Sequence, residues 1–169
     1  PLPSTSGYGR LIDEDANAMK LAHINLVARD ADSLAAFYIT VLKCELLRAP
    51  RTLYGETVSR GNGLAGSEIY TIWLKFPELE RPFLEIHQHR VSHHRDQPRV
   101  NEPGFGHLAF QMEDIADALS MIIQAGGTQI GQTIDLGTSE KPCWIAYARD
   151  PEGNILELEQ KEALLRAPS

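Results

Sequence analysis

A pattern that occurs twice constrains the fold of this chain more than any other feature of its sequence. Each copy opens with a His, reaches an Asp seven residues later and continues into an amphipathic stretch. His107 lies 84 residues after His23, and Asp114 lies 84 residues after Asp30. Self-similarity of this kind is typical of repeated structural units. The sequence therefore predicts two similar modules in tandem.

Each copy later carries one Glu in a strand-like segment, Glu85 in the first copy and Glu157 in the second. These two residues are 72 positions apart, so the first copy has 12 more residues between its His and its Glu. We assign this excess to the glycine-rich segment 49–67 and expect a mobile loop there, since long loops near sites often cover them.

The amphipathic stretches have the spacing of helices. Apolar residues recur three and four positions apart after each Asp, which gives one buried stripe. Asp30 or Asp32 can cap the first helix, and Gly126-Gly127 supplies the left-handed backbone that ends the second. The apolar stripes consist of Leu34, Phe37, Tyr38, Val41 and Leu42 in the first copy and Ile115, Ala118, Leu119, Ile122 and Ile123 in the second.

Alternating segments before and after each helix predict strands. The segments 23–28 and 107–112 place their His residues on the face opposite the apolar one. Further strands are expected over 69–75, 83–89, 143–149 and 154–159, and Asp150-Pro151-Glu152-Gly153 predicts a tight turn between the last two. If the helices cover the apolar faces, both His and both Glu residues project from the opposite, concave faces. Pairing of these concave faces would gather the four side chains at one point.

Composition limits the partners. The 169 residues include 16 Lys and Arg against 23 Asp and Glu, a net charge of -7, which disfavours nucleic acid and anionic membranes. We expect a small-molecule substrate. Cys44 and Cys143 form no disulfide framework, and no segment resembles a membrane span or a secretory signal. These features predict a cytoplasmic protein.

The expected organisation is one domain over residues 19–160, with module one over about 19–95 and module two over about 103–160. Residues 1–18 are turn-rich and then acidic, and are predicted to form a flexible N-terminal arm. Residues 161–169 are expected to form a C-terminal tail.

Over residues 20–160 the chain resembles the vicinal oxygen chelate superfamily, which includes glyoxalase I, extradiol dioxygenases and bleomycin-resistance proteins. Four motifs occur in the family's order. They are Ala22-His23-Ile24-Asn25-Leu26, Phe83-Leu84-Glu85-Ile86, Gly104-Phe105-Gly106-His107-Leu108-Ala109-Phe110, and Asp150-Pro151-Glu152-Gly153-Asn154-Ile155-Leu156-Glu157-Leu158.

The resemblance implies an α+β fold with two βαβββ modules in tandem, whose curved mixed sheets surround a metal site. It also implies a homodimer in many members, with the site sometimes shared between the two chains. Carried over by position, the metal ligands of glyoxalase I correspond to His23, Glu85, His107 and Glu157. Lys43 departs from the family, because a glycine usually ends the first helix there.

Two imidazoles and two carboxylates suit Zn, Ni, Co, Mn or Fe(II) better than calcium. In six-coordinate geometry they leave two adjacent positions for two vicinal oxygens of a substrate. The predicted activity is that of a glyoxalase-type lyase, isomerase or epimerase, which stabilises an enediolate of the chelated substrate. Glu157 is the predicted base and Glu85 its partner on the other side of the substrate. His87, Asn25 and Gln111 are the predicted substrate-binding residues.

Two alternatives remain open from the sequence. An extradiol-type dioxygenase would use Fe(II) with two His and one carboxylate, which leaves room for dioxygen. A binding protein that sequesters a drug or metabolite is the other, although such members commonly lack the ligand set that this chain retains.

Overall fold

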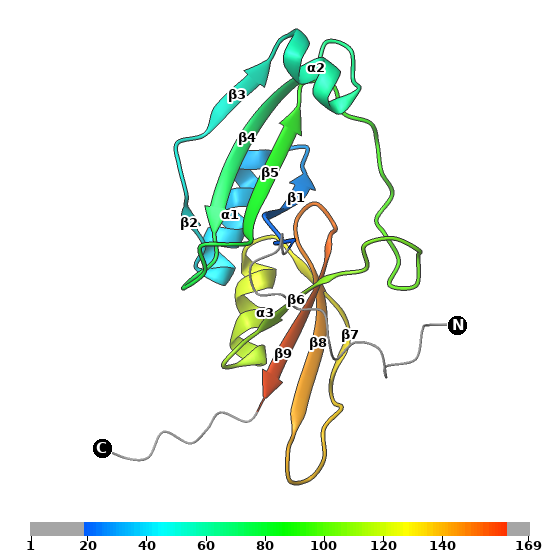
Figure 1. Cartoon of the computed structure of the whole chain (residues 1–169). Coiled ribbons are helices and arrows are strands. Elements are labelled where there is room, and N and C mark those ends of the chain that lie inside the picture. The colour runs from blue at the N-terminus through cyan, green and yellow to red at the C-terminus, as the bar shows by residue number, and fades with distance from the viewer. Residues whose placement is uncertain (1–18, 162–169) are drawn as a thin grey trace, which may run out of the picture.

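The computed structural model describes residues 19–161 (Figure 1). The predicted N-terminal arm and all but the first residue of the predicted tail lie outside the described residues. Between residues 19 and 161, no helix has the length and apolar character needed to cross a membrane.

Module one folds as a five-stranded mixed sheet covered by a helix. β1 and β5 are parallel neighbours, while β4 pairs antiparallel with β5, β2 and β3. The predicted segments 69–75 and 83–89 are confirmed as strands. The elements are β1 (His23–Val27), α1 (Ala31–Leu42), β2 (Glu45–Leu46), β3 (Arg51–Tyr54), α2 (Glu56–Asn62), β4 (Glu68–Lys75) and β5 (Phe83–His89).

The segment 49–67, expected to be a mobile loop, contains β3 and α2 instead. β3 pairs along its whole length with β4, from Arg51 opposite Thr71 to Tyr54 opposite Glu68. Gly55 and Gly63 have positive φ and flank α2. These glycines mark the ends of a short helix, which is why a glycine-rich composition was misleading here.

Module two repeats this plan with four strands. The order is β6-β9-β8-β7, with β6 parallel to β9 and the other pairs antiparallel. The elements are β6 (Leu108–Gln111), α3 (Ile115–Gln124), β7 (Thr128–Asp135), β8 (Cys143–Arg149) and β9 (Ile155–Lys161). The predicted hairpin is confirmed, since Gly153 N donates to Asp150 O at 3.0 Å between β8 and β9. His107 lies just before β6 rather than in it. The α+β class with tandem βαβββ modules is confirmed.

The helices α1 and α3 begin in the same way. The side chain of Asp30 accepts a hydrogen bond from Ser33 N, and that of Asp114 accepts one from Asp117 N. A glutamine on the last strand of each module adds a second acceptor. Gln88 accepts from Ala31 N and Gln160 accepts from Ile115 N, both at 2.9 Å. The orphan N–H groups of each helix start are thereby tied to the sheet beneath.

The end of α1 confirms the departure seen at Lys43. This residue has φ 56°, the left-handed conformation that favours glycine. Its backbone N–H bonds to Tyr38 O, and its Nζ donates to Thr40 O at 2.8 Å. A helix end that normally requires glycine is therefore built with a lysine that partly caps the last carbonyls.

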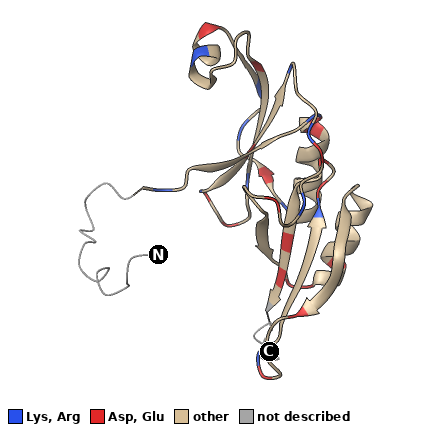
Figure 2. Cartoon of the chain, turned by 90° about the vertical axis from the view of Figure 1, so that its right-hand side faces the viewer, with Lys and Arg blue, Asp and Glu red and all other residues tan. Residues whose placement is uncertain are grey.

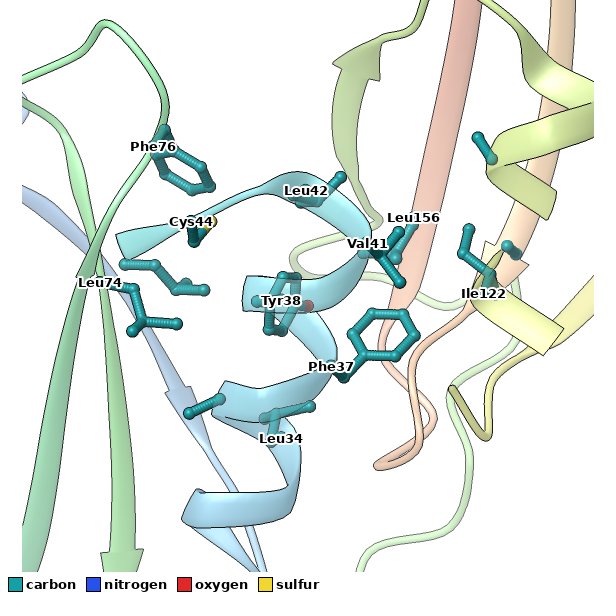
Figure 3. Close-up of a cluster of buried hydrophobic side chains, with 14 of the residues drawn as sticks. Leu34, Phe37, Tyr38, Val41, Leu42, Cys44, Leu74, Phe76, Ile122 and Leu156 are labelled. Atoms are coloured by element: carbon teal, nitrogen blue, oxygen red, sulfur yellow. The ribbon is translucent and has the colours of Figure 1, made fainter. Parts of the chain in front are cut away.

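One apolar core joins the two modules. It contains the buried faces of α1 and α3 together with the helix-covered faces of both sheets. In Figure 3, Phe37 and Val41 point toward the side of module two that carries Ile122 and Leu156, while Leu74 of module one lies on the other side of α1. Because the helices are shared between the sheets, the opposite face of each sheet points away from this core.

Two polar contacts also cross the junction. Tyr38 on α1 donates its hydroxyl to Asp150 Oδ2 at 2.9 Å, and both residues are buried. Arg29, before α1, binds Glu152 through its Nε and its backbone N–H, at 2.8 and 2.9 Å. Burial raises the pKa of Asp150, although bonds from Asn154, Tyr38 and the backbone oppose the rise. The turn between β8 and β9 is thereby fixed against module one.

We expect Tyr38→Phe to lower the free energy of unfolding by about 1–3 kcal/mol, because a buried carboxylate loses a donor. The same change raises the pKa of Asp150 further, so the loss should shrink as the pH falls and Asp150 becomes protonated. Urea unfolding at neutral and acidic pH measures this. Tyr54→Phe, at an exposed tyrosine, is the matched control. Equal stability of the two variants at neutral pH would contradict the prediction.

Candidate functional site

The first candidate site lies on the face of module one that points away from the core. β1 and β5 are parallel, with Asn25 opposite Glu85 in the register. His23 Nε2 lies 3.4 Å from Glu85 Oε2, and Asn25 Nδ2 donates to the same oxygen at 3.1 Å. Two of the predicted ligands therefore meet in this module.

The other carboxylate oxygen of Glu85 is held as firmly. Trp73 on β4 donates its indole N–H to Glu85 Oε1 at 2.8 Å, and His87 Nε2 lies 3.0 Å from that oxygen. Burial alone would raise the pKa of Glu85, but the interactions with His87, Trp73 and His23 outweigh it and lower the pKa. Glu85 is consequently an oriented carboxylate that stays ionised at neutral pH.

The second candidate site lies on the corresponding face of module two. His107 Nε2 lies 3.2 Å from Glu157 Oε2. Tyr147, opposite Glu157 on β8, forms a side-chain hydrogen bond with it, and this bond raises the pKa of Tyr147. The rings of His107 and Tyr147 are in edge contact, with centroids 5.5 Å apart. Tyr147 therefore occupies the same position relative to Glu157 as Trp73 occupies relative to Glu85.

The four predicted ligands form two pairs within the chain. Among residues 19–161, no three His, Cys, Asp or Glu side chains are grouped so that they could hold one metal ion. The two concave faces therefore do not meet within one chain, and of the two arrangements that the sequence left open, only a site shared between two chains would join the four residues. The shared helix core is the physical reason, because it places each His and Glu pair on a face directed away from the other module.

The predicted substrate-binding residues divide between the two sites. Asn25 and His87 contact Glu85 in module one. Gln111 lies in module two at the end of β6, exposed and in register with Glu159. His89, two residues beyond His87, has its pKa lowered by burial and by the nearby His87.

Two features of the site escaped sequence reasoning. Trp73 donates its indole N–H to Glu85 and stacks on Phe83 with ring centroids 4.4 Å apart. Arg48, in the segment between β2 and β3, lies with its guanidinium carbon 3.1 Å from the centroid of the Trp73 ring. The register of the β4–β5 hairpin was the signal that could have placed Trp73 opposite Glu85.

A surface hollow of about 620 Å³ lies elsewhere, on the helix-covered side of module two. Leu119 and Ile123 of α3 and Trp144 of β8 line it. None of the four predicted metal ligands lines this hollow, so it is separate from both candidate sites.

The sequence matches the family model of the Glyoxalase/Bleomycin resistance protein/Dioxygenase superfamily over residues 20–158. This match covers most of the chain and both His and Glu pairs. The chain belongs to this superfamily. No curated protein matches the sequence significantly.

Solved structures with the same fold include members of this superfamily. A glyoxalase family protein from Bacillus cereus is 19% identical, with a TM-score of 0.76 over 88% of this chain and 98% of that one. A glyoxylase/bleomycin resistance protein/dioxygenase domain from Frankia sp. is 20% identical, with a TM-score of 0.58 over 86% and 100%. The fosfomycin resistance protein FosX from Listeria monocytogenes is 16% identical, with a TM-score of 0.54 over 88% and 97%.

We expect Trp73→Phe to raise the pKa of Glu85 toward its ordinary value, because the carboxylate loses an N–H donor while the ring stays in place. NMR titration of the Glu85 side-chain carboxyl in metal-free protein measures the shift. Trp144→Phe changes a tryptophan on the other sheet and should leave this pKa unchanged. An unaltered Glu85 titration in Trp73→Phe would show that the indole bond does not stabilise the anion.

Proposed function

We propose that this chain forms a homodimeric, metal-dependent enzyme of glyoxalase, isomerase or epimerase type. In the dimer, module one of each copy faces module two of the other, so that His23 and Glu85 meet His107 and Glu157 of the second copy. The observation that carries the proposal is the pair of half-sites. Each is one imidazole and one carboxylate on an outward face, at equivalent positions of two similar sheets.

The donor geometry fits a divalent cation. Two ligands at roughly 2.1 Å from one metal, at right angles, lie roughly 3 Å apart. The nitrogen to oxygen distances of 3.4 and 3.2 Å in the two pairs are close to this spacing. Two imidazoles and two carboxylates neutralise a divalent ion and suit Zn, Ni, Co, Mn or Fe(II). A FosX structure contains Mn(II), at 17% identity and a TM-score of 0.53.

The outward face of module one also has an apolar residue that a second copy would cover. Val27 shares the face of His23 and Asn25 on β1 and is 55% exposed. A second copy placed on this face would cover Val27 together with His23 and Asn25. The proposal therefore places the dimer contact and the site on the same faces.

The two carboxylates would have different roles. When bound, the cation would make the C–H between two chelating substrate oxygens acidic. Glu85 accepts hydrogen bonds from Asn25 and Trp73, which hold it as a fixed ligand of low basicity. In module two, Ala109 stands in register where Asn25 stands in module one, so it offers Glu157 no such bond.

Glu157 is therefore the proposed base, which takes the proton from the substrate carbon and returns it to a neighbouring atom. Tyr147 keeps Glu157 oriented through its hydroxyl. This assignment distributes the chemistry over both copies, with the fixed carboxylate from one and the base that transfers the substrate proton from the other. The small-molecule substrate would enter between them.

We expect a mixed dimer to reveal the shared site. One variant carries His23→Ala with Glu85→Gln, and the other carries His107→Ala with Glu157→Gln. Each homodimer should bind no metal tightly, because every site lacks one half. A heterodimer, purified through two different tags, regains one complete site because the intact halves meet. Elemental analysis of the three dimers measures this.

Zero metal in a heterodimer that is still dimeric by sedimentation would contradict the shared site.

The activity is tested separately, on wild-type protein reloaded with each metal, as conversion of the glutathione–methylglyoxal adduct. Oxygen uptake with Fe(II) and a catechol would instead identify a dioxygenase. Binding of an aromatic antibiotic by protein that takes up no metal would identify a sequestering protein.

A further inference from the structure

The buried polar atoms without partners lie around one of the two sites. Among residues 19–161, four buried side-chain nitrogen or oxygen atoms lack a hydrogen-bond partner, and all four are in module one. They are Arg48 Nη2, Thr71 Oγ1, His87 Nε2 and His89 Nδ1. His87 Nε2 is near Glu85, but not in hydrogen-bond geometry. Buried polar groups are nearly always satisfied, so such a cluster indicates a missing ligand.

The register places these groups on one face. On β4, Thr71 and Trp73 are two residues apart and therefore share a face, and they lie directly opposite His87 and Glu85 of β5. Residues directly opposite in an antiparallel pair share a face. Arg48 lies over Trp73 on the same side. Thr71 is only 1% exposed, so its hydroxyl reaches no bulk water.

The stacking of Arg48 prepares it to bind an oxyanion. A guanidinium stacked flat on an indole keeps its N–H groups free at its edge, where they form a planar fork. That fork matches the two oxygens of a carboxylate or a phosphoryl group. Trp73 is itself fixed by its bond to Glu85 and by Phe83, so the fork is held in place before a ligand arrives.

The local charge also favours an anion. Within the described residues, neither Arg48 nor Arg51 forms an ion pair. The pKa of Arg48 is lowered by burial and then by the nearby charge of Arg51. Glu85 is the carboxylate that acts on Arg48, but both of its oxygens are occupied by Trp73 and Asn25. Figure 2 shows the other Lys and Arg residues scattered over the molecule rather than gathered elsewhere.

We propose that Arg48, stacked on Trp73 and supported by Thr71, binds an anionic carboxylate, phosphoryl or phosphonyl group of the substrate. The inference rests on the proposed function for the position of the reacting atoms, which lie at Glu85 beside this fork. It adds the class of substrate: a small molecule that carries one oxyanion besides its two chelating oxygens. Arg48 is a specificity-determining residue in this assignment.

The test measures the binding of inorganic phosphate and of acetate to the full chain, with and without Zn²⁺, at constant ionic strength. The NMR signals of the Trp73 indole N–H and the Arg48 guanidinium report binding at this position. We expect at least one anion to shift both signals. Arg48→Gln should weaken that binding about tenfold or more, and Arg48→Lys less, since a charge without the fork remains. Stronger binding of phosphate identifies a tetrahedral group, and stronger binding of acetate a carboxylate.

Arg60→Gln is the matched control, because Arg60 is an exposed arginine on α2 paired with Glu56. It should leave anion binding unchanged. Equal affinity of wild type and Arg48→Gln, or no shift of either signal by both anions, would overturn the proposal. The metal-free arm separates the two ideas: anion binding there tests Arg48 alone, whereas loss of metal binding with intact anion binding refutes only the proposed function.

Discussion

The shared apolar core is the constraint on which the arrangement of this molecule depends. Each helix has an apolar stripe that its own sheet covers only in part, and α1 and α3 bury the remainder against the other module. Complete burial of a side chain such as Phe37 or Ile122 stabilises a fold by about 1.5–3 kcal/mol. Once the helices occupy the centre, the polar faces of both sheets must point outward. The separation of the two half-sites is therefore a consequence of core packing.

The two modules are similar in structure but differ in the groups around their carboxylates. In each, an aromatic donor on the neighbouring strand binds the Glu: Trp73 binds Glu85, and Tyr147 binds Glu157. The repeat then diverges. The position of His87 next to Glu85 is occupied by Glu159 next to Glu157, so a group that lowers the pKa of Glu85 has an acidic counterpart in module two. Duplicated architecture with divergent neighbours is a simple way to obtain two carboxylates that accept different sets of hydrogen bonds.

Much of the fold could be predicted from the sequence, because the helical stripes and strand alternation are local patterns. The segments 83–89 and 143–149 match β5 and β8, and Asp30 and Asp114 cap the helices as their positions suggest. The pairing of each His with its Glu also followed from alternation. The packing of the two modules against each other could not be predicted in this way. Periodicity specifies which face of an element is apolar, but it does not specify against which other apolar face it packs. The prediction of a loop over 49–67 was wrong for a related reason. The pairing of β3 with β4 is a long-range contact, which the glycine content of the segment does not reveal.

The edge strand beside each carboxylate face explains why the two sites differ in what they can recognise. In module one this edge is formed by β2 and β3, and Arg48 lies in the segment between them. β3 extends the sheet beside β4 and places Arg51 opposite Thr71, at the edge of the Glu85 face. In module two the edge strand is β7, and Ile134 lies opposite Ile145 where Arg51 lies opposite Thr71, so the Glu157 face lacks the corresponding arginine. In the proposed dimer, each site would combine the arginine-bearing face of one copy with Glu157, the proposed base, of the other. Recognition of the substrate and transfer of its proton would then come from different subunits, so that one copy alone would not complete both steps on a bound substrate.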